Sequence, residues 1–330
     1  MDSTVLSQLE TYRGAFGFEQ SRVTSRSGDD RVEIEGTGNE DRLFATTRLA
    51  RVTAEGYFAQ ALGFGSVSVD LGAGFDPAIF RGDELNQELL LTPASASYTS
   101  ATMRLDVANL ERTTSNLSTG LDTLVVDGGQ GQEVVNARYG NVLVVGPTYS
   151  HRVYASGSVV LNATGGNDRF TLNSSGSQDQ FSVTPETTRW TREGSFIELN
   201  NFANALILGG GGNDTLSLNG TEGDDSLYLA NSILALSGSG TTVVAREFGT
   251  IDYQGGGGND LVTLIEESGN SVLRVERERV ELQTATTTTT IGDVDSVIAR
   301  SILDDDLDVI EILDGDLEFL FEAVGDWTSN

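Results

Sequence analysis

A tandem repeat with a fixed period of 46 residues constrains the fold of this chain more than any other feature. The sequence Gly-Gly-Asn-Asp ends at Asp168, Asp214 and Asp260, which are 46 residues apart. Further steps of this length reach other aspartates, and a glycine stands two residues before each of the first six aspartates: Asp30, Asp76, Asp122 and Asp306; Gly28, Gly74, Gly120, Gly166, Gly212 and Gly258. Such regularity indicates stacked copies of one structural unit.

Each repeat has the pattern of β-strands joined by short turns. Apolar residues recur two positions apart, as in the pairs Leu216/Leu218 and Leu227/Leu229, which is the period of a strand with one buried face. Gly, Asn, Ser, Thr and Asp cluster between the pairs, as they do in tight turns. The sequence therefore predicts about five short strands per repeat and almost no helix.

The repeats predict a single domain without an internal boundary. It covers residues 1–330 and consists of a partial unit 1–29, units that start near residues 30, 76, 122, 168, 214 and 260, and a partial unit 306–330. Pro77 follows the aspartate of one unit, and we expect it to distort the first strand there because proline cannot donate to a sheet. The Thr-rich segment 284–290 keeps the register and is predicted to be a strand or a loop within the array.

Two all-β architectures fit a repeat of this length. In a parallel β-solenoid, or β-helix, equivalent strands of successive repeats stack in register, and 46 residues form two coils or one wide coil. In a seven-bladed β-propeller each repeat forms one blade, and the chain holds just over seven periods. A blade normally has four antiparallel strands, whereas five strands reverse the chain direction at each repeat. This parity favours the solenoid, with the propeller as the alternative.

The composition excludes several classes of function. The chain has 20 Arg, no Lys and 49 acidic residues, and its formal charge of −29 argues against nucleic acids and anionic membrane surfaces as partners. No stretch is long and apolar enough for membrane insertion. The absence of Cys excludes thiol chemistry and Cys-based metal sites, and a single histidine, His151, excludes a multi-histidine zinc site.

Two glycine-rich turns resemble a calcium-binding repeat. Residues 209–217 and 255–263 match the nonapeptide G-G-x-G-x-D-x-U-x of the repeats-in-toxin family at every specified position. More loosely, the whole chain resembles the Gly-Asn-Asp-rich arrays of large bacterial surface proteins. The resemblance implies Ca²⁺ bound by turn carboxylates and glycine-loop carbonyls. The candidate ligands are Asp168, Asp214 and Asp260 with Asn213 and Asn259, and Asp225. Asp225 belongs to a second acidic column, whose members are Asp41, Glu133, Asp179 and Asp225.

The spacing of these turns departs from that family, whose nonapeptides follow one another directly. Here the motif recurs only every 46 residues, which leaves few carboxylates for each ion. The alternative is that each aspartate accepts hydrogen bonds from its own turn, while glycine supplies the positive φ angle that a tight turn needs.

These features lead to the hypothesis of a bacterial extracellular or cell-surface module with a structural and adhesive role and no catalysis. Its expected partners are other copies or segments of a parent protein, joined end to end, and glycans. A carbohydrate-binding or polysaccharide-degrading β-helix protein, such as a lyase or glycoside hydrolase, is the alternative, because solenoids often carry such sites. An active site should interrupt the repeat, and the cluster of His151, Arg152 and Tyr154 departs most from it. We expect His151 to be a buried residue without a catalytic role.

Overall fold

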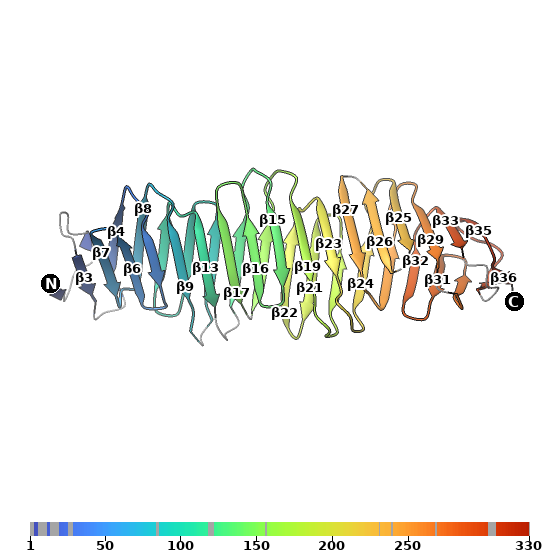
Figure 1. The fold of residues 1–330 in the computed structure, drawn as a ribbon, viewed down its shortest axis with the longest axis horizontal. Coiled ribbons are helices and arrows are strands. Elements are labelled where there is room, and N and C mark those ends of the chain that lie inside the picture. Colours follow the sequence, from blue (N-terminus) through green and yellow to red (C-terminus); the bar gives the residue numbers. More distant parts are fainter. Residues whose placement is uncertain are drawn as a thin grey trace. The chain divides into compact units, whose positions relative to one another are not determined.

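A computed structural model describes residues 3–5, 12–13, 20–25, 29–83, 86–117, 122–155, 157–230, 232–238, 240–267, 269–302 and 308–329. In these residues every regular element is a β-strand (Figure 1). The part of the chain that the structure describes therefore contains no helix that could span a membrane. The chain divides into two compact units: unit 1 comprises Met1–Gly166 and Ser195–Ile197, and unit 2 comprises Asn167–Gly194 and Glu198–Asn330.

Unit 1 contains two sheets. In spatial order, its first sheet consists of β1 (Ser3–Val5), β3 (Gln20–Thr24), β7 (Tyr57–Leu62), β6 (Leu49–Ala54), β5 (Arg42–Ala45), β9 (Pro77–Arg81), β13 (Arg112–Leu117), β17 (Ser150–Ala155), β16 (Asn141–Val145) and β15 (Val134–Arg138). Its second sheet consists of β2 (Tyr12–Arg13), β4 (Arg31–Thr37), β8 (Ser66–Gly72), β12 (Arg104–Ala108), β11 (Ser95–Thr99), β10 (Glu88–Thr92), β14 (Thr123–Asp127) and β18 (Ser158–Asn162).

Unit 2 is built in the same way. Its first sheet consists of β19 (Arg169–Asn173), β23 (Asn204–Leu208), β27 (Thr241–Arg246), β26 (Ile233–Gly238), β25 (Asp225–Ala230), β29 (Leu261–Glu266), β33 (Ser296–Ser301) and β35 (Leu320–Val324). Its second sheet consists of β21 (Thr187–Arg192), β20 (Gln180–Val183), β24 (Thr215–Asn219), β28 (Thr250–Gln254), β32 (Thr288–Gly292), β31 (Arg279–Gln283), β30 (Val272–Val275), β34 (Val309–Ile312) and β36 (Thr328–Ser329). The remaining strand, β22 (Ser195–Asn200), has residues in both units.

The prediction of an all-β solenoid built from 46-residue repeats is confirmed. Each repeat consists of one strand, a three-stranded antiparallel meander in the opposite sheet and one strand back in the starting sheet, as in β4, β5–β6–β7 and β8. Strands of successive repeats pair directly in a shared sheet, as β10 and β14 do, so the propeller alternative is wrong. The sheets are mixed: the meanders are antiparallel, and the pairs that join successive turns of the solenoid are parallel.

Equivalent strands do not stack 46 residues apart, which corrects one expectation. The chain crosses between the sheets three times per repeat, and this odd number places each meander in the sheet opposite to the previous one: β5–β7 lie in the first sheet of unit 1 and β10–β12 in its second. The parallel partner is usually 35 residues away, as for Leu43 and Ala78, or 38 residues away where it lies in the third strand of a meander, as for Val69 and Val107. Forty-six residues thus form neither two coils nor a complete structural period.

The core lies between the two sheets of each unit, because alternate residues of each strand point inward. All four leucines of the apolar pairs Leu216/Leu218 and Leu227/Leu229 are buried, with 0–5% of their surface exposed. Full burial of one such side chain stabilises the fold by about 1.5–3 kcal/mol, so the repeated apolar pairs supply much of the driving force. In unit 2 the ring of Trp190 stacks on Phe181, with centroids 5.5 Å apart.

The two irregular segments of the sequence are accommodated within strands. Pro77 does not distort β9, contrary to expectation, because it is the first residue of that strand, and Ala78 and Phe80 are buried in the regular alternation. In the Thr-rich segment, Thr284 and Thr287 close a turn, and β32 follows with Thr289 buried in the core. The prediction of a strand or loop within the array is confirmed there.

Candidate functional site

Several repeat aspartates accept a hydrogen bond from a neighbouring turn of the solenoid, and Asp30 also accepts one from the Ser25 hydroxyl in its own turn. Asp214 Oδ1 accepts the backbone N–H of Asp179 at 2.7 Å, and Asp260 Oδ1 accepts that of Asp225 at 2.9 Å. Each bond spans 35 residues, the separation of parallel strands. The same bond joins Asp41 to Asp76 and Gln87 to Asp122 in unit 1. Each of these hydrogen bonds therefore joins residues at the start of two neighbouring parallel strands.

The second acidic column closes the turn that precedes it. Asp225 Oδ2 accepts both the backbone N–H and the hydroxyl of Thr221, and Asp41 Oδ2 accepts the same two groups of Thr37 at 2.7 and 2.9 Å. These bonds fit the hydrogen-bonding role proposed for turn aspartates, but they belong to the second column. One residue of each column thus forms a carboxylate pair, represented by Asp41–Asp76 and Asp225–Asp260.

The glycine two residues before each aspartate is required by backbone geometry. Gly212 and Gly258 have φ angles of +113° and +102°, which residues with a Cβ rarely adopt. A Cβ atom on Gly258 would also lie 2.5 Å from the carbonyl carbon of Gly223 in the neighbouring turn. The motif glycines thus allow close approach of successive turns. Gly28 and Gly120 lie outside the described residues.

At the C-terminal end of unit 2 the carboxylates occupy different sequence positions. Asp306 lies outside the described residues, and Asp308 fills the corresponding place, since its Oδ1 accepts the N–H of Ser271 at 3.0 Å. The 46-residue spacing of the aspartates therefore changes to 48 at this point. The second-column carboxylate is supplied by Glu266, which accepts a hydrogen bond from the Ser271 hydroxyl, whereas in the earlier repeat Ser174 donates to Asp179. The same serine–carboxylate hydrogen bond thus forms in both repeats, with the sequence positions of the serine and the acid exchanged.

The six candidate calcium ligands belong to three successive repeats. Asp168, Asp214 and Asp260 are buried, whereas Asn213 and Asn259 are exposed. Asn259 bonds to Asp224, with its backbone N–H 2.8 Å from Asp224 Oδ1. Asp225 is brought next to Asp260 by their backbone bond. Among the described residues there is no group of three or more His, Cys, Asp or Glu placed to hold a metal ion.

The carboxylate pairs nevertheless keep unused acceptor capacity. Four buried oxygens have no hydrogen-bond partner among the residues that the structure describes: Asp41 Oδ1, Asp76 Oδ2, Asp214 Oδ2 and Asp225 Oδ1. Burial raises the pKa of Asp214 to about 6, and the charge of Asp179 acts in the same direction. Burial also raises the pKa of Asp76, with additional repulsion from Glu111 and Asp41. A proton or a cation between such carboxylates would relieve their repulsion.

His151 is enclosed within unit 1. Its side chain has no exposed surface, Nε2 lies 3.0 Å from the carbonyl oxygen of Thr92, and Nδ1 lies 2.9 Å from the Thr113 hydroxyl. The carbonyl can only accept, so Nε2 carries the hydrogen and Nδ1 accepts from Thr113. Burial lowers the pKa of His151 to about 4. Both ring nitrogens are occupied by the protein, which leaves neither nitrogen for a substrate.

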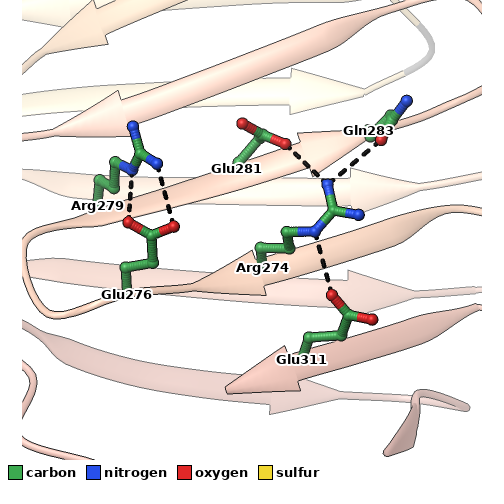
Figure 2. A network of polar contacts seen from close by, with 6 residues as sticks. All are labelled: Arg274, Glu276, Arg279, Glu281, Gln283 and Glu311. Atoms are coloured by element: carbon green, nitrogen blue, oxygen red, sulfur yellow. Dashed lines mark hydrogen bonds and ion pairs between the residues drawn. The ribbon is translucent and has the colours of Figure 1, made fainter. Parts of the chain in front are cut away.

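Ion pairs cover part of the outer surface of the second sheet of unit 2. Figure 2 shows Arg274 between Glu281 and Glu311, at 3.0 and 3.1 Å, with Gln283 as a further acceptor. Arg279 forms a two-bond contact with Glu276 nearby. These arginines are thus neutralised by neighbouring carboxylates.

No protein-family model matches the chain, and no curated protein is significantly similar to it.

Proposed function

We propose that this protein is a structural and adhesive repeat module that acts outside bacterial cells and catalyses no reaction. The observation that carries the proposal is the use made of the recurrent acids. Their carboxylates accept backbone N–H groups across neighbouring turns, as Asp214 does from Asp179, and so serve cohesion of the solenoid. His151, which departs most from the repeat, is buried with both ring nitrogens bonded.

A strongly acidic, Lys-free surface supports the extracellular part of the proposal. Salt screens repulsion between exposed charges, so a chain with a formal charge of −29 is better tolerated in a salty medium. Antibodies against the protein should label intact cells of its source. Labelling only after the cells are broken would contradict this location.

The competing function is that of a polysaccharide lyase or hydrolase. It is tested by incubating the protein with polygalacturonate, alginate and neutral glucans and measuring new reducing ends and unsaturated sugar products. The structural module should release neither product. Turnover that persists through purification and is lost when the protein is unfolded would overturn the proposal.

Calcium is the second part of the proposal, at the Asp168, Asp214 and Asp260 turns. It is supported by the two nonapeptide matches and by the buried, unpartnered Oδ2 of Asp214. Binding to the native state must raise the melting temperature. We expect a higher melting temperature in millimolar Ca²⁺ than in chelator, and a smaller difference for Asp214→Asn. Equal melting of the unmodified protein in both solutions would remove calcium from the proposal and leave the structural role intact.

A further inference from the structure

The outer face of the first sheet of unit 1 has a composition opposite to that of the whole protein. The strands β3, β5, β6, β7, β9, β13, β15, β16 and β17 contain no Asp or Glu, although the chain has 49 acidic residues. They carry seven of its 20 arginines, which define the arginine face: Arg22, Arg42, Arg51, Arg81, Arg112, Arg138 and Arg152. Each alternates with buried neighbours and is exposed or half-buried, so the seven side chains share the outer surface of this sheet.

The second sheet of the same unit lacks this feature. Its strands β2, β4, β8, β10, β11, β12, β14 and β18 contain three arginines, Arg13, Arg31 and Arg104, and six acids. Arg31 is ion-paired with Glu33, and Arg104 with Asp106. The positive charge of unit 1 is therefore concentrated on one face. Because successive repeats alternate between the two sheets, arginines that recurred with the repeat would lie on both faces.

Most guanidinium groups of the arginine face are not neutralised. Arg42 pairs with Glu40, but Arg22, Arg51, Arg81, Arg112, Arg138 and Arg152 form no ion pair with any described residue. Several lie instead over aromatic rings. Arg81 is 5.5 Å from the ring centre of Phe44, Arg112 is 5.2 Å from that of Phe75, and Arg22 is 5.2 Å from that of Phe58. A guanidinium over a ring keeps N–H donors for a carboxylate or sulfate, although those of Arg51 also donate to Gln60 and one of Arg152 donates to the Tyr154 hydroxyl.

The strand register spreads these groups across the outer surface of the sheet. One row across neighbouring strands runs through Arg22, Gln60, Arg51, Phe44, Ile79, Thr114 and Arg152. Successive residues of such a row are about 4.8 Å apart. Exposed apolar groups lie among the arginines, with Phe75 48%, Ile79 43% and Tyr154 37% exposed. The face thus offers charge and apolar contact in alternation over several strands, which suits an extended anionic chain better than a small molecule.

We propose that the arginine face binds a linear acidic polysaccharide, with guanidinium groups on its carboxylates or sulfates and aromatic and aliphatic side chains against its sugar rings. This names the partner class for the adhesive role and rests on the function proposed above. A second copy of this chain is disfavoured because two molecules of charge −29 repel each other. Duplex DNA carries about one charge per 1.7 Å and is repelled by the remaining acidic surface more strongly than a polymer of lower charge density.

The test uses two triple variants with the same change in net charge. Arg81→Gln/Arg112→Gln/Arg152→Gln removes three charges from the arginine face. The control Arg31→Gln/Arg104→Gln/Arg189→Gln removes three arginines that are ion-paired, the last with Glu198. Affinity is measured for polygalacturonate, heparin, dextran and duplex DNA at several salt concentrations. Polygalacturonate and heparin separate carboxylate from sulfate as the recognised group, and melting curves verify that both variants fold.

We expect the protein to bind at least one of the two acidic polysaccharides and not dextran, with binding weakened by salt. The arginine-face variant should bind at least tenfold more weakly, and the control less than twofold. Equal losses in both variants, no binding of either acidic polysaccharide, or tighter binding of duplex DNA would each overturn the inference. If the folded protein binds neither polysaccharide, the inference fails but the proposed structural function does not. If the protein cleaves a polysaccharide that it binds, the proposed non-catalytic function fails but the inference about the arginine face does not.

Discussion

Protonation of His151 should destabilise unit 1 as the pH falls from 7 to 4. Its folded-state pKa of about 4 lies below the ordinary value of 6.5, because the charged ring would lose its hydration in the core. Since the folded-state pKa is lowered, the stabilisation is fully present above pH 6.5 and is lost as the pH falls toward 4. A difference of 2.5 pKa units corresponds to about 3 kcal/mol in the free energy of unfolding, of which about 2.5 kcal/mol is lost by pH 4.5.

The buried carboxylates titrate over a similar range, so the histidine contribution must be isolated. Urea unfolding of the protein and of His151→Gln is measured at pH 7.5 and pH 4.5. The carboxylate contributions cancel in the difference between the two proteins, and this difference should shrink by about 2.5 kcal/mol at the lower pH. Because His151 is the single histidine, its ring signals in NMR spectra report its pKa directly. A folded protein whose ring titrates near 6.5, or a difference that is independent of pH, would refute the reasoning.

Three further substitutions test other parts of the structure. Asp214→Asn should stabilise the calcium-free protein at pH 7.5 by about 1–3 kcal/mol. The pKa of Asp214 is raised to about 6, so its ionisation removes, as the pH rises through 6, stability that is present below pH 4, and asparagine does not ionise. A lower free energy of unfolding of the variant at pH 7.5 would contradict this. Gly258→Ala should lower the free energy of unfolding by about 1–3 kcal/mol or more through its positive φ, while Gly176→Ala, which meets no atom within 4 Å, should have little effect. Leu218→Ala should cost about 2–5 kcal/mol by leaving a cavity, and exposed Ser217→Ala within about 0.5 kcal/mol; comparable urea midpoints for the two would contradict the inward orientation of Leu218.

The sequence contains enough information for the strands and the inward-facing residues, but not for the pairing of strands. Apolar pairs such as Leu216/Leu218 mark one buried face of a strand, and that mark is the same in either sheet. The alternation between sheets depends on the number of crossings per repeat, which the apolar pattern does not encode. The apolar pattern therefore does not reveal the neighbour 35 residues away. The acidic columns contain this separation, because the first precedes the second by 11 residues and the second therefore precedes the first of the next repeat by 35.

The sites show the same limits. The glycines two residues before the aspartates were recognised as turn residues, and Gly212 and Gly258 have the positive φ that this requires. The position of Asp308 in place of Asp306 depends on two extra residues, which a strict 46-residue period cannot detect. The arginine face was hidden by the total charge of −29, because a net charge contains no information about which sheet carries the arginines. Once outward positions are assigned to sheets, the absence of Asp and Glu from those strands is evident.

Disulfide mapping tests the alternation of repeats between sheets most directly, since the chain has no cysteine of its own. Ser217 and Asp252 are exposed partners on the parallel strands β24 and β28, 35 residues apart, whereas Thr263, 46 residues after Ser217, lies in the opposite sheet of unit 2. Ser217→Cys/Asp252→Cys should form an intramolecular disulfide under mild oxidation, detected by mass spectrometry, and Ser217→Cys/Thr263→Cys should not. A bond in the second pair but not in the first would contradict the fold described for unit 2.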